Sequence, residues 1–203
     1  IANIAATSIQ NAVVFEELKN VNAKLDKKIQ ELNTLFDIGK ELNATLDSAK
    51  IIKLLSYGLM GEMMLNRFII LVRRNDAVQL VEQRGFPKIP CGESNLEVLF
   101  NNWHPYLMDE SEGSPLNSEL AEHDVVAVVP MRSQDRTKGV LLLGQKISGK
   151  LFTKEELDFL YTLGNQAMIS LENAWLFEDS LEKKRLEEEL QLAKQIQMGL
   201  LPE

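Results

Sequence analysis

The side chains that could carry chemistry lie in the middle of the sequence. Cys91 is the only cysteine, and His104 and His123 are the only histidines. One thiol could attack an oxidant, but resolving the product within the chain would need a second cysteine. A histidine next to a proline, such as His104, is more often structural than catalytic. A redox role for Cys91 is therefore one alternative, beside its interpretation as an ordinary small loop residue.

The chain lacks the motifs of common enzyme classes. It has no glycine-rich phosphate loop, no pair of cysteines spaced for a metal, and no Gly-x-Ser-x-Gly around a nucleophile. We therefore expect no catalytic residue, metal or cofactor in this chain. A pocket for an unidentified small-molecule effector is expected between the predicted sheet and residues 91–124. Its candidate walls, which would suit a core equally well, are Cys91, Trp103, His104, Tyr106 and Met108.

Composition excludes several classes of partner. The net charge of −8 argues against a nucleic-acid surface, which needs clustered Lys and Arg. A single cysteine fits a reducing compartment and allows no internal disulfide, so we expect a cytoplasmic protein. Lys53, Glu62 and Arg67 interrupt the longest apolar stretches, which fall far short of the roughly 20 residues of a membrane span. No membrane contact is expected from this chain.

The first 46 residues contain no proline and predict a long helix. Apolar residues recur near heptad spacing, which favours two parallel helices side by side and hence a homodimer. Lys28 and Gly39 occupy seam positions where apolar residues would be expected. The alternative is one amphipathic helix that packs on its own domain. The apolar seam consists of Leu18, Val21, Leu25, Leu32, Leu35, Leu42 and Leu46.

A second long helix is predicted near the end of the chain. Thr153 and Glu156 form a capping box, with Phe152 and Leu157 as the flanking apolar pair. No helix breaker follows until Pro202, so the helix would be roughly 70 Å long. Its second half must project from a domain of this size and pack on something else. The residues expected to form this dimer or signalling face are Leu186, Leu190, Ala193 and Leu200.

Between the long helices, the pattern predicts an α+β domain with an antiparallel sheet. A helix restarts at Asp47, with Leu46 and Ile51 as its apolar pair, and a short helix follows the capping box of Ser94 and Glu97. Strands are expected at 68–72, 77–83, 106–108, 125–131 and 139–144, with loops at 109–118 and 132–138 and a turn at Asn75-Asp76. Pro130 predicts a strand edge or bulge. Long helices should cover one face, and loops with short helices the other.

Two distant stretches of the sequence are similar to each other. Residues 7–18 read TSIQNAVVFEEL and residues 169–180 read ISLENAWLFEDS. Either two amphipathic helices converged by chance, or each stretch ends a copy of one domain type. The second interpretation predicts a tandem protein in which residues 1–19 end an earlier domain.

Three segments resemble the GAF domain family. They are LNTLFDIGKELNATLDSAKIIKLL, the strand pair VVAVVPM and KGVLLLG, and SGKLFTKEELDFLYTLGNQAMISLENAWLFE. The resemblance covers 31–178, with 20–46 as a linking coiled coil and 179–203 as an output helix. Family members that attach a bilin usually have His after the cysteine, whereas Gly92 follows Cys91 here. Of the family's cyclic-nucleotide signature only Asp109-Glu110 is present, so neither ligand is expected.

The last residues, EEELQLAKQIQMGLLPE, resemble the helix that enters the phosphatase domain of SpoIIE- and RsbU-type proteins. Those proteins are metal-dependent serine phosphatases, so Mn or Mg would belong to a domain beyond this chain. The resemblance implies a regulatory module that dimerises and signals to a phosphatase acting in sigma-factor or stress signalling. A ligand-free dimerisation spacer is the alternative from another class. The residues that carry this resemblance are Leu190, Ala193, Ile196, Gln197, Leu200, Leu201 and Pro202.

Overall fold

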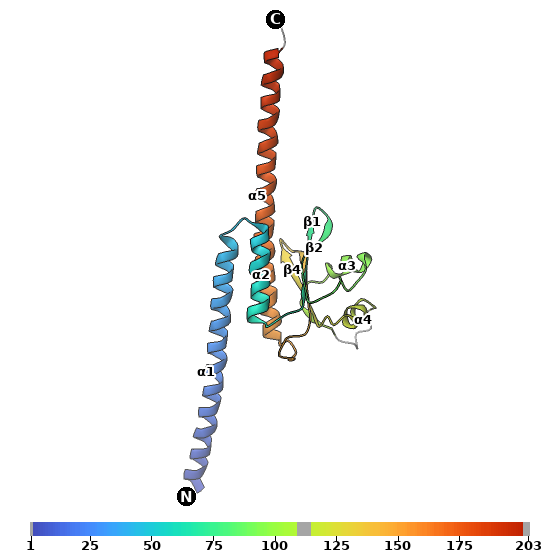
Figure 1. The fold of residues 1–203 in the computed structure, drawn as a ribbon. Helices are drawn as coiled ribbons and strands as arrows, with labels where there is room; N and C mark the ends of the chain where they lie inside the picture. The colour runs from blue at the N-terminus through green and yellow to red at the C-terminus, as the bar shows by residue number, and fades with distance from the viewer. Residues whose placement is uncertain (1, 109–114, 201–203) are drawn as a thin grey trace. The chain divides into compact units, whose positions relative to one another are not determined.

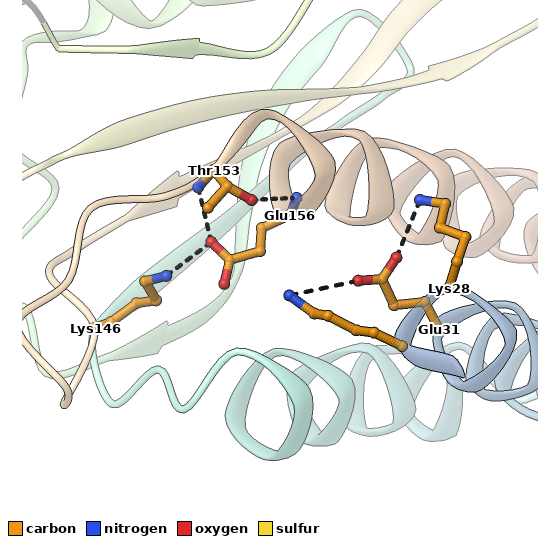
Figure 2. Close-up of polar contacts among 6 residues, drawn as sticks. Lys28, Glu31, Lys146, Thr153 and Glu156 are labelled. Atoms are coloured by element: carbon orange, nitrogen blue, oxygen red, sulfur yellow. Dashed lines mark hydrogen bonds and ion pairs between the residues drawn. The ribbon is translucent and has the colours of Figure 1, made fainter. Parts of the chain in front are cut away.

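The computed structural model describes residues 2–108 and 115–200. The chain divides into two compact units, Ile1–Ile38 and Gly39–Glu203. Helix α1, Ala2–Asn43, is continuous through both the predicted boundary at residue 19 and the division between the units. In the first unit Lys28 Nζ donates to Glu31 Oε2 over 3.0 Å (Figure 2). The predicted seam residues Leu18, Val21, Leu25 and Leu32 are exposed, and Leu35 is half-buried.

The last turns of α1 belong to the second unit and pack on it. Gly39 and Leu42 are buried, and a Cβ placed on Gly39 would lie 3.7 Å from Cδ of Gln166. Asn43 Oδ1 accepts a hydrogen bond of 3.3 Å from Ser170 Oγ. The expectation that Leu42 continues a free dimer seam is therefore wrong. A Cβ at Gly39 would make only an ordinary contact with Gln166, so this position would also accept alanine, and Leu42 is enclosed by its own domain.

The sheet has five antiparallel strands, as the sequence predicted. They are β1 (Phe68–Arg74), β2 (Ala77–Arg84), β3 (Tyr106–Leu107), β4 (Ala127–Ser133) and β5 (Arg136–Leu143). Their order across the sheet is β2-β1-β5-β4-β3, and every neighbouring pair is antiparallel. Asn75 and Asp76 have φ values of 53° and 60°, which confirms the expected tight turn between β1 and β2.

The predicted polar loop at 132–138 is wrong. These residues extend β4 and β5 into a hairpin, whose turn is Gln134-Asp135 with φ values of 48° and 60°. Their polar side chains suggested a loop, yet Arg132 pairs with Thr137 and Ser133 with Arg136 across the hairpin, and the hairpin also has partners outside the sheet. The backbone N–H of Arg132 donates to Asn165 Oδ1 over 2.7 Å, and Thr137 Oγ1 donates to the Asn102 carbonyl over 2.8 Å.

Helices cover both faces of the sheet (Figure 1). On one face lie α2 (Ser48–Glu62) and α5 (Lys154–Leu200), which pack on each other, and α5 packs on β4. The opposite face carries α3 (Glu93–Leu99) and α4 (Pro115–Glu122). One hydrophobic core lies between the sheet and helices α2 and α5. The second core lies beneath the short helices and includes Ile69, Leu99, Leu120, Val128 and Leu142, all fully buried. The α+β layering is therefore confirmed.

Two local predictions on this second face are wrong. The loop expected at 109–118 contains the start of α4 from Pro115, a residue whose fixed φ and missing N–H suit the first turn of a helix. Residues 109–114, including Asp109-Glu110, lie outside the described residues. Helix α3 begins at Glu93 with Gly92 as its N-cap, so Ser94 lies inside the helix rather than capping it.

The start of α5 is fixed by the predicted capping box (Figure 2). The Thr153 backbone N–H donates to Glu156 Oε2 over 2.8 Å, and the Glu156 N–H donates to Thr153 Oγ1 over 3.3 Å. Lys146 Nζ, on a side chain only 7% exposed, also donates to Glu156 Oε2 over 2.7 Å. Phe152 and Leu157 are buried, as the apolar pair predicted. The helix therefore leaves the sheet from a well-anchored first turn.

Candidate functional site

The structure divides the five predicted pocket residues between two places. Cys91, Tyr106 and Met108 are partly buried and pack against the second core, beside α3 and α4. The Tyr106 hydroxyl also accepts a hydrogen bond of 3.2 Å from Asn102 Nδ2. These three side chains therefore take the alternative role that the sequence left open, as parts of the core.

The environment of Cys91 disfavours a reactive thiolate. Burial, with a further contribution from the nearby Glu119 carboxylate, raises the pKa of the Cys91 thiol to about 11 from 9.0. Cys91 is therefore protonated near neutral pH, and a protonated thiol is a poor nucleophile. Glu119 itself accepts a hydrogen bond of 2.7 Å from Asn95 Nδ2. The structure thus argues against the redox alternative for Cys91.

Trp103 and His104 face away from this core. Both are exposed, and the Trp103 side chain has 60% of its surface accessible. The guanidinium carbon of Arg132 lies 4.8 Å from the centre of the Trp103 ring, which is a cation–π distance. Trp103 is therefore placed by β4, on the side of the domain where the hairpin turns lie.

A large open groove lies at that end of the sheet. We call it the hairpin groove: it has a volume of about 960 Å³ and runs between the two hairpin turns, the end of α3 and helix α5. Its walls include the turns at 75–76 and 134–135, together with the apolar or aromatic residues Phe100, Trp103, Ile169, Trp175 and Leu176. Four cations and four carboxylates also line it, namely Arg73, Arg74, Arg136 and Lys138 with Asp76, Asp135, Glu172 and Asp179. The equal numbers of cations and carboxylates leave the groove without a strong net charge.

Ion pairs join the sheet to α5 along this groove. Arg74 Nη1 lies 3.3 Å from Glu178 Oε2 and its Nη2 lies 3.1 Å from Asp179 Oδ1. The Arg74 guanidinium also lies 5.2 Å from the centre of the Trp175 ring. Lys138 pairs with Glu172, which lies nearly two turns before Asp179 on α5. The last residue of β1 and a residue of β5 are thereby tied to one face of the helix.

Helix α2 also contacts α5 at Glu178. The Ser48 hydroxyl, at the start of α2, donates to Glu178 Oε1 over 2.5 Å. Glu178 thus links α2, β1 and α5 where α5 ceases to pack on the domain. The neighbouring N-cap of α2 is as predicted, with Asp47 Oδ1 accepting from the Ala49 and Lys50 backbone N–H groups over 2.9 and 3.2 Å.

Beyond this point α5 remains helical but exposed. Every described side chain from residue 176 to residue 197 is exposed, including the predicted Leu186, Leu190 and Ala193. The side chain of Leu200 lies outside the described residues. Arg185 Nε donates to Glu189 Oε1 over 3.0 Å, one of the expected i,i+4 pairs. This half of α5 therefore has no packing partner within the described chain.

The sequence alone did not indicate the hairpin groove. The signals available were the basic residues at strand ends, Arg74 and Lys138, and an acidic pair at Glu178 and Asp179. Their meeting depends on the sheet order, which one sequence does not reveal. Within residues 2–108 and 115–200, no cluster of three metal-ligating side chains occurs, and no helix is long and apolar enough to cross a membrane.

Comparisons with known proteins agree with this architecture. The potassium sensor histidine kinase KdpD of Escherichia coli has a GAF domain of similar fold, with a TM-score of 0.53, 16% identity, and coverage of 72% of this chain and 96% of that one. The GAF domain of a phosphoenolpyruvate-protein phosphotransferase from Coxiella burnetii has a TM-score of 0.56 and 20% identity, with coverage of 74% and 98%. These likenesses concern the fold alone.

A curated relative is similar over a longer stretch. Diguanylate cyclase A of Treponema denticola is 24% identical over an alignment of 173 residues, which covers 75% of this chain and 46% of that protein. This chain therefore spans about half the length of the relative it matches. A family model described as GAF domain matches residues 59–173, which are more than half of the chain and include the whole sheet, α3, α4 and the first part of α5. The chain belongs to the GAF domain family of sensory and regulatory modules.

Proposed function

We propose that this GAF module is a dimeric signal relay whose exit helix controls an output domain. One observation carries the proposal: α5 stays helical and exposed over residues 176–197, with Leu186, Leu190 and Ala193 at heptad spacing. An exposed apolar stripe of this kind is stabilised when it packs on a second helix. The exposed Leu18, Val21 and Leu25 of α1 support a second contact of the same type.

The output domain is proposed to be a metal-dependent serine phosphatase of the SpoIIE/RsbU type, acting in the cytoplasm on a protein of sigma-factor or stress signalling. Support comes from residues 187–203, whose sequence resembles the helix that enters such domains. Mn or Mg would serve that domain, and an unidentified effector would act on the module. A diguanylate cyclase output is the second candidate, because the curated relative carries that name.

Dimerisation is tested by sedimentation equilibrium of the chain. Leu190→Asp should convert a dimer to a monomer, because it places a carboxylate in the apolar seam. Leu181→Asp is the matched control, since Leu181 is equally a leucine of α5, is 53% exposed and lies on the opposite side of the helix from Leu190 in a heptad count. A Leu190→Asp chain that remains dimeric would refute the proposed seam.

The relay is tested in the full-length protein through helix phase. One residue inserted after Glu182 rotates everything beyond it by about 100°, whereas seven inserted residues nearly restore the phase. A relay predicts that one residue changes output activity strongly and that seven residues restore most of it. Equal activity in all three proteins would favour the ligand-free spacer. Assaying phosphatase and cyclase activity separately in the unmodified protein decides between the two outputs.

A further inference from the structure

The sequence similarity between α1 and α5 extends over residues 1–17 and 163–179, which align without a gap. The next residues of the two stretches, LKNV and SLEK, have no position in common. The similarity therefore ends where α5 leaves the domain. The identical positions are Asn3, Ala5, Ser8, Asn11, Ala12, Phe15 and Glu16, which align with Asn165, Ala167, Ser170, Asn173, Ala174, Phe177 and Glu178.

The buried positions of α5 in this range keep their chemical character in α1. Two of them differ noticeably in size, since Ala2 aligns with Gly164 and Ala6 aligns with Met168. The remaining positions that differ in residue type along the two stretches are exposed or half-buried in α5. The buried residues of α5 are Leu163, Gly164, Ala167, Met168, Ser170, Leu171 and Ala174, which align with Ile1, Ala2, Ala5, Ala6, Ser8, Ile9 and Ala12.

Two polar residues among the identical positions have specific partners in the domain. Asn165 Oδ1 accepts the backbone N–H of Arg132 over 2.7 Å, and Ser170 Oγ donates to Asn43 Oδ1 over 3.3 Å. An amphipathic pattern alone requires apolar residues on one face, and it does not select an asparagine or a serine at a particular point. The matching Asn3 and Ser8 therefore favour a shared packing arrangement over chance similarity.

The acidic residues at the point of exit are repeated as well. Glu178 accepts a hydrogen bond from the Ser48 hydroxyl and pairs with Arg74, and Asp179 pairs with the same guanidinium. Glu16 and Glu17 occupy the aligned positions in α1. Residues that link α5 to the rest of its domain are thus present in a helix that has no such domain beside it in the described chain.

The described part of this stretch of α1 has no packing partner. Ala174 is fully buried, whereas the aligned Ala12 is exposed. Phe15 is 71% exposed, against 45% for Phe177. Every described side chain from residue 10 to residue 30 is exposed. Helices of globular proteins gain most of their stability from packing, so we expect another domain to cover this stretch.

The apolar seam of α1 does not account for this stretch. Steps of seven toward the N-terminus from Leu18 reach Asn11, and those from Val21 reach Val14 and then Thr7. The polar Asn11 and Thr7 interrupt the seam before residue 15. Pairing with a second helix therefore explains the residues from Leu18 onward better than it explains residues 1–17.

From this correspondence, we infer that residues 1–17 of α1 pack on a second sheet domain of the GAF type, as residues 163–179 of α5 pack on this one. The second domain precedes this one in the same protein, because such a helix follows its sheet in the chain. It supplies a backbone N–H for Asn3, a polar side chain for Ser8, and a cation with a hydroxyl for Glu16. The inference goes beyond the proposed relay, since it requires neither a dimer nor a particular output.

Hydrogen exchange of the full-length protein tests this placement. The backbone amides of residues 3–16 should exchange at least about tenfold more slowly in the full-length protein than in the chain of 203 residues, because a packed helix opens less often. Amides 165–178 of α5 provide the reference for a helix packed on such a sheet. Equal exchange of residues 3–16 in the two proteins would overturn the inference.

A matched pair of variants identifies the packed face. In the full-length protein, Ala12→Leu should speed exchange of residues 3–16 by at least about tenfold, because a packed face does not accommodate the larger side chain. Asn11→Leu should change it by less than about threefold, because the aligned Asn173 is exposed. Equal effects of the two variants would overturn the inference.

The chain of 203 residues provides two controls for this pair. Ala12→Leu and Asn11→Leu should both leave its exchange unchanged, because both positions are exposed there. Ala174→Leu and Asn173→Leu should reproduce in α5 the contrast expected for α1, because Ala174 is fully buried and Asn173 is exposed. An Ala12→Leu effect of the same size in this chain and in the full-length protein would contradict packing on a second domain.

Discussion

Arg74 Nη2 and Asp179 Oδ1 lie 3.1 Å apart, joining the last residue of β1 to the point where α5 leaves the domain. The same guanidinium reaches Glu178 through its other nitrogen over 3.3 Å. A forked arginine held by two carboxylates and a tryptophan ring is better fixed than an ordinary surface pair. Arg74 therefore links the β1–β2 hairpin directly to α5.

Replacing Arg74 by Ala should therefore destabilise the domain measurably. We expect a loss of about 1 kcal/mol in the free energy of unfolding, since the pairs are partly exposed and screened. Arg185→Ala is the control: Arg185 forms an i,i+4 pair with Glu189 on exposed helix, and its loss should cost less than about 0.5 kcal/mol. Urea unfolding at one fixed protein concentration measures both, and equal losses would contradict the special position of Arg74.

The anchored start of α5 gives a second, graded prediction. Thr153→Ala removes one capping hydrogen bond and should cost about 1 kcal/mol. Glu156→Ala should cost about 2–3 kcal/mol, because it also leaves the buried Lys146 ammonium without its carboxylate. Lys154→Ala, at the exposed first position of α5, should be nearly neutral. Thermal or urea unfolding should rank the three variants in this order, and a reversed order would show that capping outweighs the buried pair.

Two helical glycines should respond oppositely to alanine. A Cβ on Gly164 would lie 2.9 Å from Met131 Cγ, inside the packed contact between α5 and β4, so Gly164→Ala should cost about 1–3 kcal/mol. A Cβ on Gly61 meets nothing within 4 Å in α2, so Gly61→Ala should stabilise by up to about 1 kcal/mol. Differential scanning calorimetry would show one melting temperature falling and the other rising. A stabilising Gly164→Ala would mean that Met131 moves aside freely.

Cys91 should alkylate slowly in the folded domain. Its pKa of about 11, against 9.0 for an ordinary thiol, leaves roughly 100-fold less thiolate at pH 8. Iodoacetamide labelling followed by mass spectrometry should therefore be far slower than for the same chain in urea. Because the folded thiol holds its proton more tightly, its stabilising effect is complete below pH 9.0 and is lost as pH rises through about 11. Similar rates in the folded and unfolded chains would contradict this environment.

The periodic parts of the chain could be predicted well from sequence. The buried face of α5, with Leu160, Leu163 and Leu171, repeats at helical spacing, and the Thr153 box marks its first turn. The strands β1 and β5 each contain a continuous, buried apolar run, residues 68–72 and 140–143, so few other structures suit these runs. These elements depend on nearby residues, and local patterns are what one sequence reveals.

The candidate site depends on distant residues and could not be predicted in the same way. Arg74 and Asp179 are far apart in the sequence and meet only because α5 crosses the sheet beside the β1–β2 turn. Residues 132–138 look polar enough for a loop, although Arg132 and Ser133 pair with Thr137 and Arg136 across the hairpin. Trp103, Tyr106 and Met108 share an aromatic or soft apolar character, yet the first is exposed and the other two join the core.

The edges of the sheet have one further consequence. The edge strand β3 pairs only with Ala127 and Val128 of β4. Pro130, farther along β4, has no N–H to donate. The other edge strand, β2, carries the charged residues Glu82 and Arg84 and has a pairing irregularity opposite Ile70 and Leu71. Edge strands of this kind are poor templates for strands of a neighbouring molecule. Copies of this fold can therefore be crowded together, in tandem or in large assemblies, with little tendency to merge into aggregated β-structure.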